Sequence, residues 1–241
     1  MIRKIFASFI LCLLSSGVAV AGTPILKTEK CPIGGEKVLI TTTDACSVFS
    51  RNRTMAFQNY SSCDFVTRLP QCPKNKLPLY KEFSKEDLED IKIFMGTKEY
   101  RKLQEQSRYL IAYFVEQNLQ TPTEWLDPFS LLLSGIWYDG VNTYDDAEYI
   151  SILLQEAAPA IGKADLGEQP YITAIAAYLN SWFGDVEDAR GLLDSISPNI
   201  LLEDEYLRIY VEKIEECMAA GRTDRCSPDS LIRFDDLLSD E

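Results

Sequence analysis

Residues 177–193 read AYLNSWFGDVEDARGLL, and they contain the clearest structural signal in the chain. Gly184 and Asp185 form a tight break between two runs that have the apolar spacing of α-helices. Two small residues, Ala177 and Ala189, stand where these helices must approach each other closely. The stretch therefore predicts a pair of helices joined by a short turn.

The same pair of helices matches part of a known repeat pattern. Ala177 and Ala189 occupy the small positions of a tetratricopeptide repeat, and Gly184 occupies its inter-helix turn. The other helical pairs do not reproduce the pattern, and an ordinary αα-hairpin explains the stretch equally well. We expect tetratricopeptide-like packing here and leave the two alternatives open.

Helical periodicity covers the chain from residue 84 to residue 238, which we expect to form one helical, tetratricopeptide-like domain. The links between helices are short, so neighbouring helices should be antiparallel. Capping residues, prolines and glycine breaks predict roughly eight helices, which begin near Ser84, Thr97, Thr121, Thr143, Pro170, Val186, Glu205 and Ser227. We expect the helix from Glu205 to end at Ala220 because Gly221 is a good C-cap.

Residues 22–80 have a different character, that of a small cysteine-rich β module. The β-branched run from Lys37 to Thr43 follows a Gly-Gly turn and predicts a strand, and residues 64–67 are a shorter candidate. A segment with so little apolar content needs covalent cross-links or a bound metal to hold its shape. The expected fold class is therefore mainly α, with a disulfide-stapled β module in front of an α-helical hairpin array.

Residues 1–21 have the features of a secretory signal peptide. Arg3 and Lys4 precede an apolar run that is too short to span a bilayer, and residues 19–21 form an Ala-x-Ala cleavage site. The mature chain is expected to begin at Gly22. Because no later segment is apolar enough to cross a membrane, we expect a protein of the periplasm or a secreted one, with no membrane insertion after cleavage.

Net charge limits the classes of partner, and cysteine content agrees with export. The formal net charge is −13, which disfavours binding to nucleic acid or to anionic lipid. The expected mature chain keeps six cysteines, an even number that suits an oxidising compartment. Cys217 and Cys226 are close in sequence and far from the others, so we expect them to pair. The remaining four should form two bonds within the N-terminal segment, in a pairing that spacing alone leaves open.

Two of these cysteines begin incomplete zinc knuckles. The sequences CPIGG at residues 31–35 and CPKNK at residues 72–76 each start like C-P-x-C-G but lack the second cysteine. With the helices that follow, this order resembles an uncharacterised bacterial family that joins a zinc ribbon to tetratricopeptide-like helices. Gly34 and Asn75 stand where the family has metal ligands, so we carry over no zinc and expect no other metal or cofactor.

The resemblance does imply a disulfide pattern. In a zinc ribbon the two knuckles face each other across the metal, which places Cys31 near Cys72 and implies a bond between them. Cys46 and Cys63 then form the inner bond. The alternative is a four-thiolate metal site made of the same residues, which an oxidising compartment disfavours.

Conventional catalytic motifs are absent from the sequence. The chain contains no histidine, which excludes Ser-His-Asp and Cys-His nucleophilic catalysis in their usual form. A group of carboxylates near Trp137 and Tyr138 suits a glycosidase, and consists of Asp139, Asp145, Asp146 and Glu148. Acidic residues are also favoured at helix N-termini, and we prefer that explanation. We expect no catalytic residue.

Large aromatic residues at helical spacing are candidates for a binding surface, and equally for a core. The candidate surface consists of Trp125, Trp137, Tyr138, Tyr171 and Trp182. On this basis we expect an exported, non-catalytic interaction or scaffolding protein with a protein or peptide partner. One rival hypothesis is a carboxylate-based hydrolase acting on cell-envelope glycans. Another is a thiol–disulfide protein in which Cys217 and Cys226 exchange.

Overall fold

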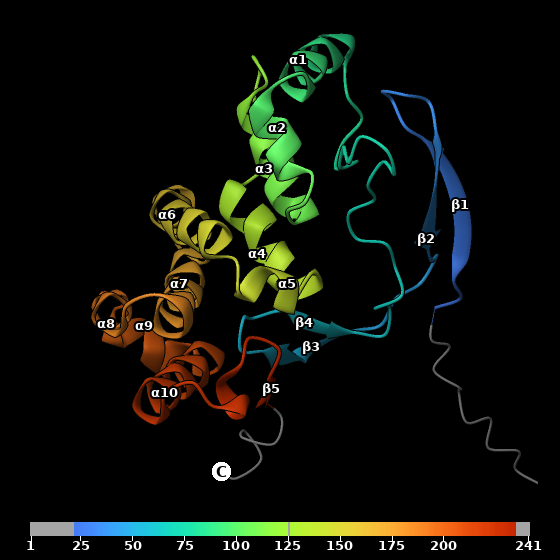
Figure 1. The fold of residues 1–241 in the computed structure, drawn as a ribbon. Helices are drawn as coiled ribbons and strands as arrows, with labels where there is room; N and C mark the ends of the chain where they lie inside the picture. Colours follow the sequence, from blue (N-terminus) through green and yellow to red (C-terminus); the bar gives the residue numbers. More distant parts are fainter. Residues whose placement is uncertain (1–21, 125, 235–241) are drawn as a thin grey trace, which may run out of the picture.

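A computed structural model describes residues 22–124 and 126–234, and it shows an arc of helices around an extended N-terminal segment (Figure 1). The helices within these ranges are α1 (Lys85–Met95), α2 (Lys98–Leu103), α3 (Arg108–Gln117), α4 (Pro128–Tyr138), α5 (Val141–Tyr144), α6 (Ala147–Lys163), α7 (Gln169–Phe183), α8 (Val186–Asp194), α9 (Pro198–Glu203) and α10 (Glu205–Ala220). The strands are β1 (Ile25–Lys30), β2 (Lys37–Thr42), β3 (Val48–Thr54), β4 (Asn59–Ser61) and β5 (Leu231–Arg233). The expected fold class, mainly α with a small β region, is confirmed. The expected leader, residues 1–21, lies outside the described residues.

Several helices begin and end where local capping chemistry places them. Before α1, the Ser84 hydroxyl accepts a hydrogen bond from the Asp87 amide, and the Asp87 carboxylate accepts one from the Ser84 amide. Helix α10 begins after Asp204, which accepts from the Leu207 amide, and it ends at Gly221, where φ is +74°. The bounds predicted for this helix are confirmed.

Two predicted helix boundaries in the middle of the chain are wrong. The helix placed at Thr121 begins instead at Pro128, because Asp127 is the residue that caps it, accepting from the Ser130 amide at 2.7 Å. The helix predicted to run on from Thr97 is divided into α2 and α3. The second starts after Ser107, whose hydroxyl accepts from the Tyr109 amide at 3.2 Å.

Three other local predictions need correction. Thr143 lies inside α5, and Asp146 caps α6 in its place. Residues 64–67 form a turn, closed by a hydrogen bond from the Val66 amide to the Cys63 carbonyl, and not a strand. The helix predicted to start at Ser227 is also wrong over the described residues, which include strand β5. A partner strand elsewhere in the chain supplies the hydrogen bonds that a helix would have made internally.

The strands form two separate antiparallel sheets. In the first, β1 pairs with β2 over their whole length, with Ile25 opposite Thr42 and Lys30 opposite Lys37. The second has the order β4-β3-β5. Arg53 of β3 lies opposite Ile232 of β5, so a strand from near the C-terminus completes a sheet that begins in the N-terminal segment.

One hydrophobic core joins the N-terminal segment to the helices. Cys31, Met55 and Leu77 are buried in the same cluster as the inward faces of α3, α4, α7 and α10. The predicted hairpin of α7 and α8 contributes Ala177 and Ala189, both fully buried, as close packing of two helices requires. Of the described helices, none is both long and apolar enough to cross a membrane.

The crossing of α4 and α6 offers a test of this packing. A β-carbon on Gly135 would overlap the Tyr149 hydroxyl, which donates a hydrogen bond to the Leu132 carbonyl. We expect Gly135→Ala to lower the free energy of unfolding by about 1–3 kcal/mol. Gly162→Ala in α6 is the control, since a β-carbon there meets nothing within 4 Å. It should be neutral or stabilising by up to about 1 kcal/mol. Urea denaturation measures both, and equal effects would contradict the packing described.

Candidate functional site

The inner face of the helical arc binds the protein's own N-terminal segment through backbone carbonyls. In the upper part of the arc in Figure 1, the Tyr100 hydroxyl and the Gln104 amide both donate to the Asn75 carbonyl, at 2.8 and 3.2 Å. The Arg108 guanidinium donates to the Leu69 carbonyl at 3.1 Å. Side chains from α2, its C-cap Gln104 and α3 therefore supply hydrogen bonds to backbone carbonyls of the N-terminal segment. These carbonyls need such donors because the segment has no continuous sheet.

The lower part of the arc repeats this arrangement at the turn between β3 and β4. The Trp137 indole donates to the Ala56 carbonyl, and the Tyr210 hydroxyl donates to the Met55 carbonyl, both at 2.8 Å. Phe57 has φ +64°, a conformation rare for a bulky residue, and its ring lies against Tyr210 with centroids 4.5 Å apart. The turn is therefore held in an unusual backbone conformation by the helices around it.

Burial keeps the buried tyrosines in the neutral form, whose hydroxyl can donate a hydrogen bond. It raises the pKa of Tyr210 well above its ordinary value, and it does the same for Tyr178, whose hydroxyl donates to the Cys226 carbonyl at 2.7 Å. Both hydroxyls are therefore protonated at neutral pH. The inner face acts as a set of fixed donors, and the protein's own chain occupies it.

The structure places most of the aromatic residues predicted as a binding surface in internal contacts. Trp137 holds Ala56, and the Tyr138 ring lies under the Arg68 guanidinium, 5.1 Å away. Tyr171 donates to the Asp204 carboxylate at 2.7 Å. Trp182 is half-buried against the core, and Trp125 lies outside the described residues. Tyr138 is still 38% exposed, so its contact with Arg68 leaves part of the side chain open to solvent.

Two of the four carboxylates considered for glycan hydrolysis, Asp139 and Asp146, have partners within the protein. Asp146 accepts hydrogen bonds from the Glu148 and Tyr149 amides as the cap of α6. Asp139 accepts from the Ser107 hydroxyl at 2.7 Å and pairs with Arg108 at 3.5 Å. Helix capping and ion pairing explain both positions, as their place near helix termini suggests.

A buried carboxylate that sequence reasoning did not single out is Glu116, which is 6% exposed. It accepts from the Tyr80 hydroxyl at 2.8 Å and from the Thr123 amide, and Lys81 lies 3.9 Å away. Burial and this hydrogen bond raise the pKa of Tyr80. Buried ionisable groups often mark active sites, but here each carboxylate oxygen has a partner within the protein. The network ties the chain before α1 to α3 and to the loop before α4.

The three disulfides are Cys31–Cys72, Cys46–Cys63 and Cys217–Cys226, with Cα atoms 5.8, 5.7 and 5.5 Å apart. These are the pairs that the resemblance and the spacing imply. Cys217 lies in the last turn of α10, and both it and Cys226 are buried, which makes this pair a structural cross-link.

Asn75 links the turn that follows Cys31 to the turn that follows Cys72. Its side-chain amide donates to the Ile33 carbonyl at 2.8 Å, and its side-chain oxygen accepts from the Leu77 amide at 3.1 Å. A hydrogen bond and the Cys31–Cys72 disulfide thus join the two corners directly. Among the residues that the structure describes, no three His, Cys, Asp or Glu side chains are grouped to hold a metal ion.

The β1–β2 hairpin exposes two leucines on one of its faces. Leu26 and Leu39 are 66% and 64% exposed. The pairing of Leu26 with Thr41, Thr28 with Leu39 and Lys30 with Lys37 puts all six side chains on one face of the hairpin, which we call the outward face. Sequence reasoning found β2 but missed β1. The residues of β1, ILKTEK, do not alternate between apolar and polar, so the strand lacked the usual sequence signal.

Comparisons with protein-family models, with curated proteins and with solved structures of known proteins gave no match to this chain. The arguments about function therefore rest on the residues and contacts described above.

The donors of the inner face can be tested one at a time. Tyr210→Phe removes the hydroxyl that satisfies the buried Met55 carbonyl, so we expect the free energy of unfolding to fall by about 1–3 kcal/mol. Tyr206→Phe on the same helix is the control, because the Tyr206 ring is only half-buried, against Phe234. It should change stability by less than about 0.5 kcal/mol. Equal losses in urea denaturation would argue against this role for Tyr210.

Proposed function

We propose that this protein is exported and acts as a non-catalytic interaction or scaffolding protein, which binds a protein partner through the outward face of the β1–β2 hairpin. The observation that carries the proposal is the pair of exposed leucines, Leu26 and Leu39, on a surface that is otherwise polar. Exposed apolar side chains that share one face of a sheet mark interaction sites more often than scattered ones do.

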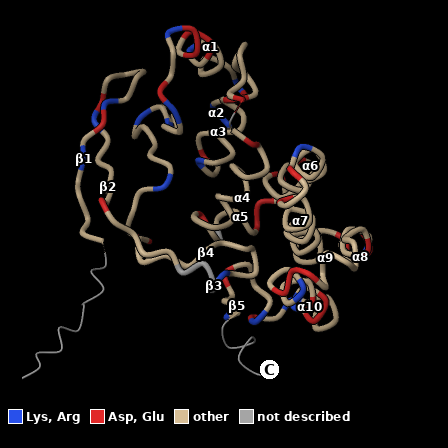
Figure 2. Tube along the Cα trace, turned by 180° about the vertical axis from the view of Figure 1, so that it is seen from behind, with Lys and Arg blue, Asp and Glu red and all other residues tan. Residues whose placement is uncertain are grey.

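Charge on the outward face indicates the kind of partner. Lys30 lies directly opposite Lys37, and like charges in that position destabilise a strand pair. None of the six residues of the face is acidic, whereas the chain as a whole has a net charge of −13. Figure 2 shows basic residues along the hairpin with acidic residues among them, and residues of both charges on the helices. A partner segment with apolar side chains flanked by carboxylates would cover the leucines and neutralise the lysines.

The hairpin also offers a backbone edge. Among the described strands, β1 pairs only with β2, so one edge of β1 has no strand beside it. Such edges bind extended segments by strand addition, with backbone hydrogen bonds supplying affinity and side-chain contacts supplying specificity. An acidic, extended segment of a partner protein fits both the edge and the face.

The inner face of the arc is less suited to a partner, because the protein's own residues 55–57 and 69–77 occupy it. Export is supported by the three disulfides, which persist in oxidising compartments. We propose no hydrolase activity, since capping and ion pairing account for Asp139 and Asp146.

Photo-cross-linking in cells that export the protein tests the surface. A photoreactive amino acid at Leu39 should give a discrete cross-linked product, and the same group at Leu166 should not, although Leu166 is 88% exposed. Lys30→Glu with Lys37→Glu should abolish the product by reversing the charge of the face. Identical products from both positions would overturn the proposed surface, and a product with the mass of two chains would identify the partner as a second copy.

Mass spectrometry of the protein recovered from such cells tests export separately. We expect a chain that begins at Gly22, with a mass lowered by six hydrogens for the three disulfides. An intact leader with free thiols would contradict export, whatever the outcome of the cross-linking.

A further inference from the structure

One disulfide differs from the other two in its access to solvent. Cys31 and Cys72 are 2% and 0% exposed, and Cys217 and Cys226 are 9% and 4% exposed. In the remaining bond Cys63 is fully buried, whereas Cys46 is exposed. Thiol–disulfide exchange requires a thiolate to reach one sulfur of the bond. Of the six bonded cysteines, Cys46 is the only exposed residue, so it is the one that we expect an external thiolate to reach.

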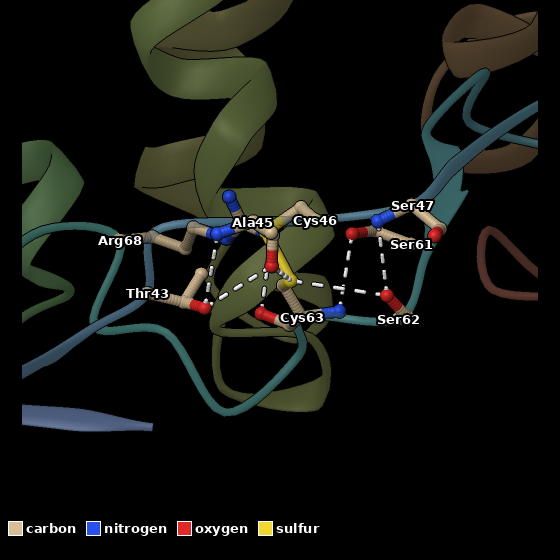
Figure 3. Close-up of a disulfide and its surroundings, with 8 residues drawn as sticks. All are labelled: Thr43, Ala45, Cys46, Ser47, Ser61, Ser62, Cys63 and Arg68. Carbon is tan, nitrogen blue, oxygen red and sulfur yellow. Dashed lines mark hydrogen bonds between the residues drawn. A yellow bond between two sulfur atoms is a disulfide. The ribbon is translucent and has the colours of Figure 1, made fainter. Parts of the chain in front are cut away.

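The surroundings of Cys63 suit a leaving group (Figure 3). Its sulfur lies 3.4 Å from the Ala45 carbonyl oxygen and 3.8 Å from the Ser62 hydroxyl oxygen. The hydroxyl can donate to a Cys63 thiolate, and the carbonyl can accept from a Cys63 thiol once it is protonated. The Arg68 guanidinium donates to the Cys63 carbonyl at 3.3 Å, which places a positive charge beside the same cysteine. Nearby cations and donors stabilise a thiolate.

We infer that Cys46–Cys63 is a thiol-exchange site, at which the thiolate of an external dithiol forms a mixed disulfide with Cys46. The attacking sulfur bonds to the Cys46 sulfur, and the Cys46–Cys63 bond breaks with its electron pair on Cys63. The Cys63 thiolate then takes a proton from water. The second thiol of the dithiol attacks the mixed disulfide, which releases Cys46 as a thiol and the dithiol as its own disulfide. The protein gains two electrons and two protons, and the dithiol loses them.

The fold can tolerate reduction of the Cys46–Cys63 bond because the β3–β4 hairpin, which lies between the two cysteines, is anchored at its turn. The Met55 amide donates to the Ser230 carbonyl at 2.8 Å, and the Ala56 amide donates to the Pro228 carbonyl at 3.0 Å. The Trp137 and Tyr210 donors hold the carbonyls of the same two residues. Reduction of the disulfide therefore releases the open end of the hairpin, where the two cysteines lie, and leaves the turn attached to the helices.

Two hydrogen bonds still connect the strands at the open end of the hairpin after reduction. The Ser62 amide donates to the Ser47 carbonyl at 3.0 Å, and the Ser47 amide donates to the Ser62 hydroxyl at 3.1 Å. These bonds hold the two cysteines close together after reduction, so the disulfide can re-form. Exchange at this site is reversible within the folded protein, and it is independent of the outward face of the β1–β2 hairpin.

Limited reduction of the native, full-length mature protein tests the site. The protein is treated with a small excess of dithiothreitol, quenched by alkylation at successive times and mapped by peptide mass spectrometry. We expect Cys46 and Cys63 to be labelled together, at least about tenfold faster than the other four cysteines. Earlier labelling of another pair, or simultaneous labelling of all six, would overturn the inference.

The direction of attack has its own test. A monothiol such as cysteamine forms a mixed disulfide but lacks the second thiol that would resolve it. We expect its adduct on Cys46, with Cys63 recovered as a free thiol. An adduct on Cys63 would mean that the buried sulfur is attacked, which contradicts the proposed role of Cys46.

Paired variants separate exchange from stability. Cys46→Ser with Cys63→Ser should keep the far-ultraviolet circular dichroism of the native protein and lose the fast alkylation. Cys217→Ser with Cys226→Ser is the matched control, and it should keep the fast phase. Persistence of a fast phase in the first variant would assign it to another disulfide. If either variant fails to fold, the order of labelling in the unaltered protein still decides the question.

Discussion

Capture of the N-terminal segment by the helices is the constraint on which the rest of this structure depends. The segment is extended, contributes only short strands and buries residues such as Met55 and Leu77, so its backbone groups need partners away from water. Tyrosine, tryptophan and arginine side chains on the inner face of the arc provide them. Without these donors, burial of the segment would leave carbonyls unsatisfied, and the arc would expose its apolar lining.

This constraint also accounts for where the free surfaces lie. The inner face, where a helical array commonly binds peptides, is filled by the protein itself. The β1–β2 hairpin lies across the N-terminal coil from the helices (Figure 1), and it exposes Leu26 and Leu39. The disulfides fit the same picture, because Cys31–Cys72 closes the buried corner that Asn75 bridges, whereas Cys46 remains exposed at the open end of a hairpin whose turn is anchored.

Sequence reasoning succeeded where the signal was local. The capping box at Ser84 predicted the start of α1, and the C-cap glycine Gly221 predicted the end of α10. Both predictions were correct because each signal depends on residues within one helical turn. It failed at Thr121, where a second, similar Asp-Pro signal six residues later is the true helix start. It failed again at Ser227, because the hydrogen bonds of β5 go to a strand that is far away in sequence.

Apolar periodicity, capping residues and cysteine spacing were enough to specify a mainly α chain with a cross-linked N-terminal region. The tertiary structure alone determined that Trp137 and Tyr210 donate hydrogen bonds to the protein's own backbone. The Trp137–Ala56 and Tyr210–Met55 hydrogen bonds span 81 and 155 residues, and no local pattern encodes contacts of that separation. For the same reason, Trp137 in the sequence reads equally as core or as binding surface, and only the packing of distant segments distinguishes the two.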